Sequence, residues 1–208
     1  MWILDFLAPR SCVFCGEPGE GSEKSICTGC FADLPWNETP VSPTPGIFES
    51  SIAVLHYSFP IDVAIKALKF RRNLFYAPAL AEVLCVATPL LAPDIDAVLP
   101  VPLHWRRKAM RGFNQATEIA KPIAKSLSVP LVSIVRRKRA TPFQSGLDAV
   151  ERARNLRRAF TIIRPASYTH ILIVDDVVTT GATVQALATL LLSSGVTKVS
   201  VLAVARAG

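Results

Sequence analysis

The chain has 208 residues, of which 50% are hydrophobic and 19% are charged, a balance that is typical of globular proteins and excludes a disordered chain. No apolar run reaches the roughly 18 residues that a membrane-spanning helix needs. The apolar start, residues 1–9, contains Asp5 and lacks the cationic region of a secretion signal. We therefore expect a cytoplasmic protein with one full domain and a small accessory module.

The net charge of +7 is unevenly distributed along the chain. Residues 100–158 contain 14 lysines and arginines against three acidic residues, whereas residues 1–50 contain seven acidic residues and two basic ones. Such asymmetry indicates that one face meets an anion: phosphate, pyrophosphate or a nucleic-acid backbone. A basic surface that is merely solvated is the alternative.

The chain divides into a cysteine-containing part with a proline-rich end, residues 1–50, and a domain of alternating strand and helix patterns, residues 51–208. In that domain the apolar spacing predicts strands at 52–57, 96–101, 131–135, 171–174 and 199–205, and helices at 62–70, 77–87, 114–127, 148–158 and 183–194. The last strand–helix–strand unit implies a parallel sheet with right-handed crossovers. The predicted fold class is α/β, a parallel sheet flanked by helices.

Four cysteines in the first part have the spacing of a zinc site. They are Cys12, Cys15, Cys27 and Cys30, in the pattern C-x2-C-x11-C-x2-C. Two such knuckles can place four thiolates tetrahedrally around zinc, and in the cytoplasm a metal is favoured over two disulfides. Because four cysteines leave no position for water, we expect the zinc to be structural. Cys85 lies in an apolar helical pattern and is assigned to the core.

The turn after the predicted strand at 171–174 has the composition of a phosphate site. Ligands bind at the carboxyl ends of strands in open α/β sheets. This turn offers small side chains, hydroxyls and the backbone N–H groups of a helix start, from Thr179, Thr180, Gly181, Ala182 and Thr183. Asp175 and Asp176 stand beside it, where they can accept hydrogen bonds from ribose hydroxyls or act through a metal. The expected ligand is a phosphorylated ribose or a nucleic acid.

Two basic segments are further candidates for anion binding. The first also begins at the carboxyl end of a strand, and it carries Arg106, Arg107, Lys108 and Arg111 to the same rim. The second contains Arg136, Arg137, Lys138 and Arg139, with Phe143 nearby as a possible stacking group for a base. We interpret it as a mobile loop that acts either on a ligand or as a nucleic-acid-binding arm. A solvated loop without a ligand is the alternative.

The run from Ile171 to Thr183 resembles the 5-phosphoribosyl-1-pyrophosphate motif of type I phosphoribosyltransferases, with four apolar residues, two acidic ones and a Thr-Thr-Gly loop. The chain as a whole resembles the ComF family of competence-associated, phosphoribosyltransferase-like proteins, which includes ComFC and GntX. Four features carry this resemblance over nearly the full length: the two cysteine knuckles, residues 100–103 with 111–115, Gln144 with 152–160, and the loop 174–183.

This resemblance implies a type I phosphoribosyltransferase-like fold and a role for each site residue. Asp175 and Asp176 would contact the ribose 2- and 3-hydroxyls and are the candidate catalytic residues, and residues 179–183 would hold the 5-phosphate. Magnesium would accompany phosphoribosyl pyrophosphate. The basic segment at 106–111 resembles the pyrophosphate loop in position, and the segment from Arg136 resembles the flexible loop that closes over the site.

The family further implies the handling of incoming single-stranded DNA in the cytoplasm during natural transformation. Other competence or recombination proteins are candidate partners. The preferred function is therefore a DNA-uptake accessory protein that binds phosphoribosyl pyrophosphate and single-stranded DNA. The alternative is an active phosphoribosyltransferase of nucleotide salvage. A salvage enzyme needs a hood that reads a base, and the sequence shows no evident base-reading pocket.

Overall fold

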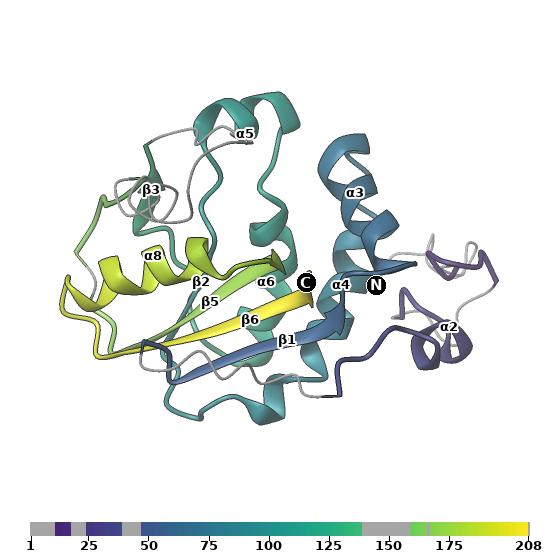
Figure 1. The fold of residues 1–208 in the computed structure, drawn as a ribbon, viewed down its shortest axis with the longest axis horizontal. Coiled ribbons are helices and arrows are strands. Elements are labelled where there is room, and N and C mark those ends of the chain that lie inside the picture. The colour runs from purple at the N-terminus through teal and green to yellow at the C-terminus, as the bar shows by residue number, and fades with distance from the viewer. Residues whose placement is uncertain (1–10, 18–23, 39–46, 139–158, 166, 208) are drawn as a thin grey trace, which may run out of the picture.

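The structure, a computed structural model, describes residues 11–17, 24–38, 47–138, 159–165 and 167–207. Its centre is a four-stranded sheet in the order β1-β6-β5-β2 (Figure 1). All three strand pairs are parallel, which confirms the α/β class. The strands are β1 (Ser50–His56), β2 (Ala97–Pro100), β5 (His170–Val178) and β6 (Lys198–Arg206).

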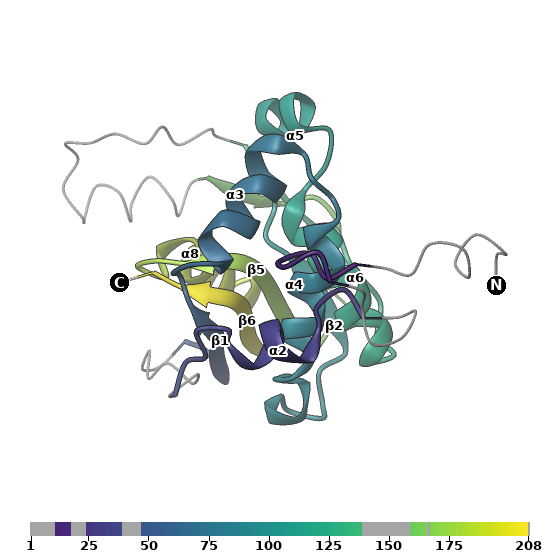
Figure 2. The same ribbon diagram turned by 90° about the vertical axis from the view of Figure 1, so that its right-hand side faces the viewer.

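Helices cover both faces of this sheet because successive strand residues point to opposite sides. In β5, Leu172 and Val174 belong to one buried cluster, and Ile171 and Ile173 belong to the other. Figure 2 shows α8 on one side of the sheet and α4 and α6 on the other. The helices are α3 (Ile61–Arg71), α4 (Tyr76–Cys85), α6 (Gln115–Ser126), α8 (Ala182–Leu192) and the short 3-10 helix η1 (Thr88–Leu90).

Most predicted elements are confirmed within a few residues, but β5 runs further than the predicted strand at 171–174. It continues to Val178, so Asp175 and Asp176 lie in the strand and not in the turn. The reason is the neighbouring strand, because β6 pairs with β5 through Asp175↔Ala203 and Val178↔Arg206. Backbone pairing in the sheet outweighs the poor strand propensity of aspartate.

Two more regions differ from the sequence-based prediction. Residues predicted as a loop form a short helix, α5 (Trp105–Arg111), which ends at Gly112 with φ 90°. The strand predicted at 131–135 is wrong in its extent, because β3 is Val135–Arg137 and pairs antiparallel with β4 (Phe160–Ile162). The helix predicted at 148–158 lies outside the described residues. Within the described ranges, no helix combines the length and apolar character that crossing a bilayer requires.

The N-terminal module, described at residues 11–17 and 24–38, packs against α4 and β1. It contains the short helix α2 (Thr28–Ala32) and lies beside α3 and α4 in Figure 1. The backbone N–H of Ser25 donates to Glu82 Oε1 at 2.6 Å, and the module forms an antiparallel bridge from Trp36 to Leu55 of β1. The module therefore shares a hydrophobic core with the sheet domain.

Candidate functional site

Two buried carboxylates stand at the carboxyl end of β5. Asp175 is 9% exposed and Asp176 is 3% exposed. Lys69 Nζ, from the last turn of α3, forms an ion pair with Asp176 Oδ1 at 2.8 Å. The other oxygen, Asp176 Oδ2, has no hydrogen-bond partner among the described residues. Because a buried acceptor without a donor is unfavourable, this oxygen is suited to receive a hydrogen bond from a ligand.

The surroundings of Asp175 favour its neutral form more than water does. Burial raises the pKa of Asp175 to about 7, and the charge of Asp176 acts in the same direction. Lys69 and Arg137 lower the pKa of Asp175, but they do not outweigh burial. Asp175 is therefore close to half-protonated near neutral pH and can give or take a proton there.

Arginines from two other elements surround the acidic pair. Burial lowers the pKa of Arg111 in α5, and it also lowers the pKa of Arg137 in β3. The positive charge of Arg107 lowers both further, while Asp176 acts on Arg111 and Asp175 acts on Arg137 in the opposite sense. Lys69, Arg111 and Arg137 thus interact with the two carboxylates, with Arg107 near the two arginines, and the surplus of positive charge suits an anionic ligand.

The loop after β5 leads into helix α8 through a left-handed residue. Gly181 has φ 73° and is the N-cap of α8. A Cβ at this position would meet nothing within 4 Å, so a side chain would not be too large for the site. Glycine is favoured there because of the left-handed backbone conformation. Thr179 and Thr180 are exposed, and Ala182 N donates to Thr180 Oγ1 at 3.4 Å. The first N–H groups of a helix have no partner within it, so they are available to a phosphate.

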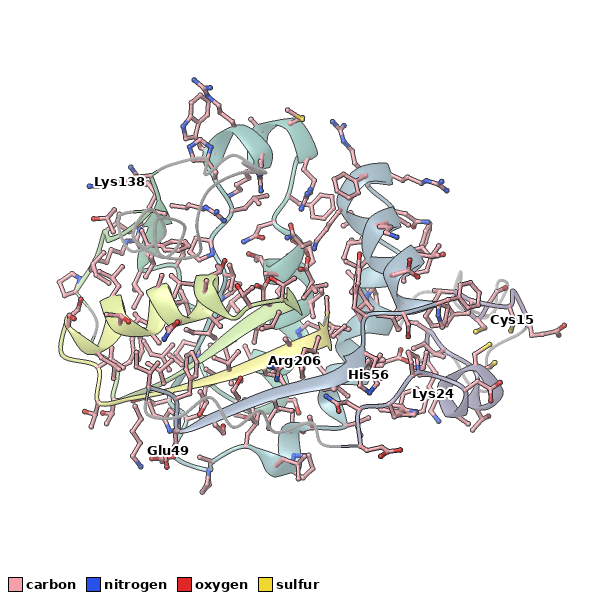
Figure 3. All side chains as sticks on the ribbon, in the orientation of Figure 1. Cys15, Lys24, Glu49, His56, Lys138 and Arg206 are labelled. Atoms are coloured by element: carbon pink, nitrogen blue, oxygen red, sulfur yellow. The ribbon has the colours of Figure 1, made fainter. Side chains whose placement is uncertain are left out.

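Several of the residues predicted from the sequence lie near the acidic pair, at the carboxyl ends of the strands, and others lie away from it. Arg106 lies over the ring of Trp105 at 5.3 Å, and Lys108 is exposed on α5. Arg136 and Lys138 are exposed, whereas Arg139 lies outside the described residues. Figure 3 shows Lys138 beyond β3, and it shows Arg206 and His56 at the ends of β6 and β1.

Arg137 was grouped in the sequence with the nucleic-acid arm, but it is half-buried and close enough to the acidic pair for the charge of Asp175 to raise its pKa against the effect of burial. Its guanidinium also lies 5.5 Å from the centre of the Phe160 ring of β4. The pairing of β3 with β4 therefore sets this arginine apart from Arg136 and Lys138, which are exposed.

Lys69 is the site residue that the sequence did not reveal. It belongs to an amphipathic helix far from the acidic pair along the chain, where a lysine is an ordinary surface residue. The only signal was its place at the start of a basic run, Lys69-Phe70-Arg71-Arg72, at the end of the helix. Neither its partner nor its depth could be read from that run.

The four cysteines of the N-terminal module lie together. Their sulfur atoms are all within 4.8 Å of one another, and Cys15 Sγ and Cys27 Sγ are 3.7 Å apart. A tetrahedral zinc with bonds of about 2.3 Å to sulfur requires sulfur–sulfur separations of about 3.8 Å. Burial raises the pKa of the Cys12 thiol, but backbone N–H groups near it outweigh this and lower the pKa to about 6. Burial and the neighbouring cysteines raise the pKa of Cys30 instead, so the argument for structural zinc rests on the geometry of the four sulfur atoms.

Comparison with known families and proteins agrees with both parts of the structure. Residues 3–46 match the double zinc ribbon domain, and residues 114–208 match the phosphoribosyl transferase domain. These matches and the parallel sheet confirm the phosphoribosyltransferase-like fold with a zinc-binding N-terminal module.

Three curated relatives extend over most of the chain. It is 35% identical to the DNA utilization protein YhgH of Escherichia coli O157:H7, over 91% of this chain and 87% of that protein. It is 33% identical to Competence protein F of Haemophilus influenzae, over 95% and 86% respectively. It is 28% identical to Competence protein ComFC of Bacillus subtilis, over 88% and 72%. The chain therefore belongs to the ComF family of phosphoribosyltransferase-fold competence proteins.

Proposed function

We propose that this protein binds phosphoribosyl pyrophosphate with magnesium at the carboxyl end of strand β5. We further propose that it handles single-stranded DNA in the cytoplasm during DNA uptake. The observation that carries the ligand is the buried acidic pair with one unpartnered oxygen, next to a helix-start loop and close to Lys69, Arg111 and Arg137. The DNA role is supported by the relatives, which are a DNA utilization protein and two competence proteins.

Each part of the ligand has a matching group in this arrangement. The loop 179–183 would hold the 5-phosphate through backbone N–H groups and hydroxyls. Asp175 and Asp176 would accept hydrogen bonds from the ribose hydroxyls, and the unpartnered Asp176 Oδ2 supplies one free acceptor. Arg107 and Arg111 would bind the pyrophosphate, where guanidinium groups form paired hydrogen bonds with oxygens.

Magnesium fits the same site. Carboxylate oxygens and phosphate oxygens are the ligands it prefers, and Asp175 and Asp176 offer the former beside the expected position of the latter. Bound there, the ion would neutralise the diphosphate of the ligand. The protein itself supplies the two carboxylates, which are held in place by burial, and two arginines, which pack on neighbouring aromatic rings.

A working phosphoribosyltransferase is the second candidate, and the protonation of Asp175 favours it. A carboxyl with a pKa of about 7 can accept a proton from an attacking group near neutral pH. In such a reaction the bond from C1 of the ribose to pyrophosphate breaks, and an acceptor nucleophile forms the new bond to C1. A phosphoribosyltransferase therefore needs an acceptor substrate, whereas a protein that only binds phosphoribosyl pyrophosphate does not.

DNA would approach the basic segments at the same edge. The exposed Arg136 and Lys138 extend beyond the acidic pair, and they are suited to phosphate contacts with a strand. Arg139, in the unplaced continuation of that segment, is a further candidate. Other competence or recombination proteins would meet the protein while it holds DNA.

Calorimetric titration of the zinc-loaded protein with phosphoribosyl pyrophosphate and magnesium tests the ligand. The wild type should bind, and Asp175→Asn with Asp176→Asn should abolish binding while the fold is retained. Glu49→Gln is the matched control, since it removes an exposed carboxylate just before the amino end of β1, whereas the acidic pair lies at the carboxyl end of β5 (Figure 3). Equal affinity in the double variant and the wild type would exclude this site.

Two further measurements separate the parts of the proposal. Binding of a labelled single-stranded oligonucleotide tests the DNA role, with and without phosphoribosyl pyrophosphate. Release of pyrophosphate in the presence of candidate nucleobase acceptors tests the alternative. Ligand binding without pyrophosphate release supports the accessory role, and acceptor-dependent release supports the enzyme.

A further inference from the structure

Helix α5 buries none of its residues. Short helices in globular proteins are normally held by an apolar face that packs on the core. Instead, α5 presents Trp105 at 62% exposure and Met110 at 74% exposure. It also carries four basic residues and no acidic one. Packing against the core of the described chain does not account for this combination of exposed apolar and cationic side chains.

The end of α3 meets the last residues of α5. Phe70 is 75% exposed, and the guanidinium of Arg111 lies 5.9 Å from the centre of its ring. The guanidinium of Arg72 donates to the backbone oxygen of Met110, which joins the last turn of α3 to the last turn of α5. Both helices stand at the carboxyl edge of the sheet (Figure 1). We call the surface formed by Phe70, Arg72, Trp105, Arg106 and Met110 the aromatic–basic surface.

From this geometry we propose that the aromatic–basic surface binds single-stranded DNA, with bases stacked on Trp105 and Phe70 and phosphates held by the adjacent arginines. Arg106 already lies over the face of Trp105 at 5.3 Å, so a cation and a ring are presented together. Single-stranded nucleic acids are bound in this way, by rings that stack on bases and by cations that follow the backbone. The proposal rests on the DNA role proposed above and assigns it a place.

The charge of this surface argues for a nucleic acid over the other possible occupants. A second copy of the chain would bring the same cations face to face, which is unfavourable. Duplex DNA would satisfy the cations, but it keeps its base faces stacked inside the helix and would leave both rings exposed to water. A single strand supplies anions and free aromatic faces at once.

The test measures the affinity of a fluorescent oligothymidine for the zinc-loaded full chain by anisotropy, beside an oligonucleotide of the same length with abasic sites. The wild type should prefer the oligothymidine. Trp105→Ala and Phe70→Ala should each weaken its binding by about fivefold or more, with an unchanged dependence on salt. Trp105→Phe should recover most of the affinity, since a ring remains.

Leu90→Ala is the matched control, because Leu90 is 57% exposed and lies in η1, which precedes the amino end of β2, whereas α5 follows its carboxyl end. It should bind both oligonucleotides as the wild type does. The abasic oligonucleotide should bind Trp105→Ala and the wild type equally, because it has no base to stack.

The results distinguish this inference from the proposed function. If the wild type binds no single-stranded DNA, the DNA role itself fails. If the wild type binds DNA but Trp105→Ala and Phe70→Ala bind it equally well, or if the wild type does not distinguish the abasic strand, the aromatic–basic surface is excluded and the DNA role stands.

Discussion

Replacing Asp175 by Asn should stabilise the ligand-free protein, and the gain should grow with pH. Burial raises the pKa of this carboxyl to about 7, whereas its ordinary value is 3.8. Between these values the folded protein holds a proton that the unfolded chain has released, so rising pH favours unfolding. The contribution to the free energy of unfolding falls by up to about 1.4 kcal/mol per pH unit, or about 4 kcal/mol across the window.

Urea unfolding at intervals from about pH 5 to pH 8 measures this directly, with excess zinc and without magnesium or ligand. The quantity to follow is the difference in unfolding free energy between Asp175→Asn and the wild type, because titration of the other groups then cancels. The difference should grow by about 2 kcal/mol between pH 5 and pH 7 and level off above. The variant should also fail to bind phosphoribosyl pyrophosphate.

The control is again Glu49→Gln, which removes an exposed carboxylate away from the acidic pair. A constant difference for Asp175→Asn, or one that shrinks as the pH rises, would refute the claim that burial holds a proton on Asp175. The expected pattern, more stable yet inactive in binding, is that of a residue kept for function at a cost in stability.

Three other perturbations have defined outcomes. Lys69→Met should destabilise the ligand-free protein by roughly 3 kcal/mol in urea unfolding, because Asp176 is left buried without its cation, and adding Asp176→Asn should restore most of the loss. Arg136→Ala with Lys138→Ala should reduce the slope of log affinity for single-stranded DNA against log salt by about 1.4, and an unchanged slope would remove both from the DNA path. Chelation of zinc should lower the thermal midpoint, measured by circular dichroism, and added zinc should restore it; an unchanged midpoint would contradict a structural metal.

The sequence predicted the parallel sheet, the cysteine cluster and the turn into α8 because each depends on local spacing. The buried strand, the four cysteines and the Thr-Thr-Gly turn are all contiguous signals. The errors fall where tertiary contacts decide. Strand β5 continues through two aspartates because β6 pairs with it, and α5 was missed because it has no buried face to produce an apolar stripe.

Two residues of the candidate site could not be predicted from the sequence for the same reason. Lys69 joins Asp176 only because α3 crosses the edge of the sheet, and Arg137 reaches the pair only because β3 pairs with β4. No spacing along the chain encodes either contact. The sequence-based prediction differs from the structure at the acidic pair, at α5 and at the β3–β4 pair. All three belong to the candidate site or lie next to it, as expected where function overrides local preference.

The strand order β1-β6-β5-β2 has a consequence for how the chain assembles during synthesis. Strand β1 is made first, yet its only neighbour in the described sheet is β6, which is made last of the four. Until then its open edge invites pairing with other chains. The zinc module, already synthesised, contacts β1 through the Trp36–Leu55 bridge and through Asn37 N and Val54 O at 3.0 Å. Because Leu55 also pairs with Ala205 of β6, the module lies along the other edge of β1, and in the folded protein it covers part of the outer edge of the sheet.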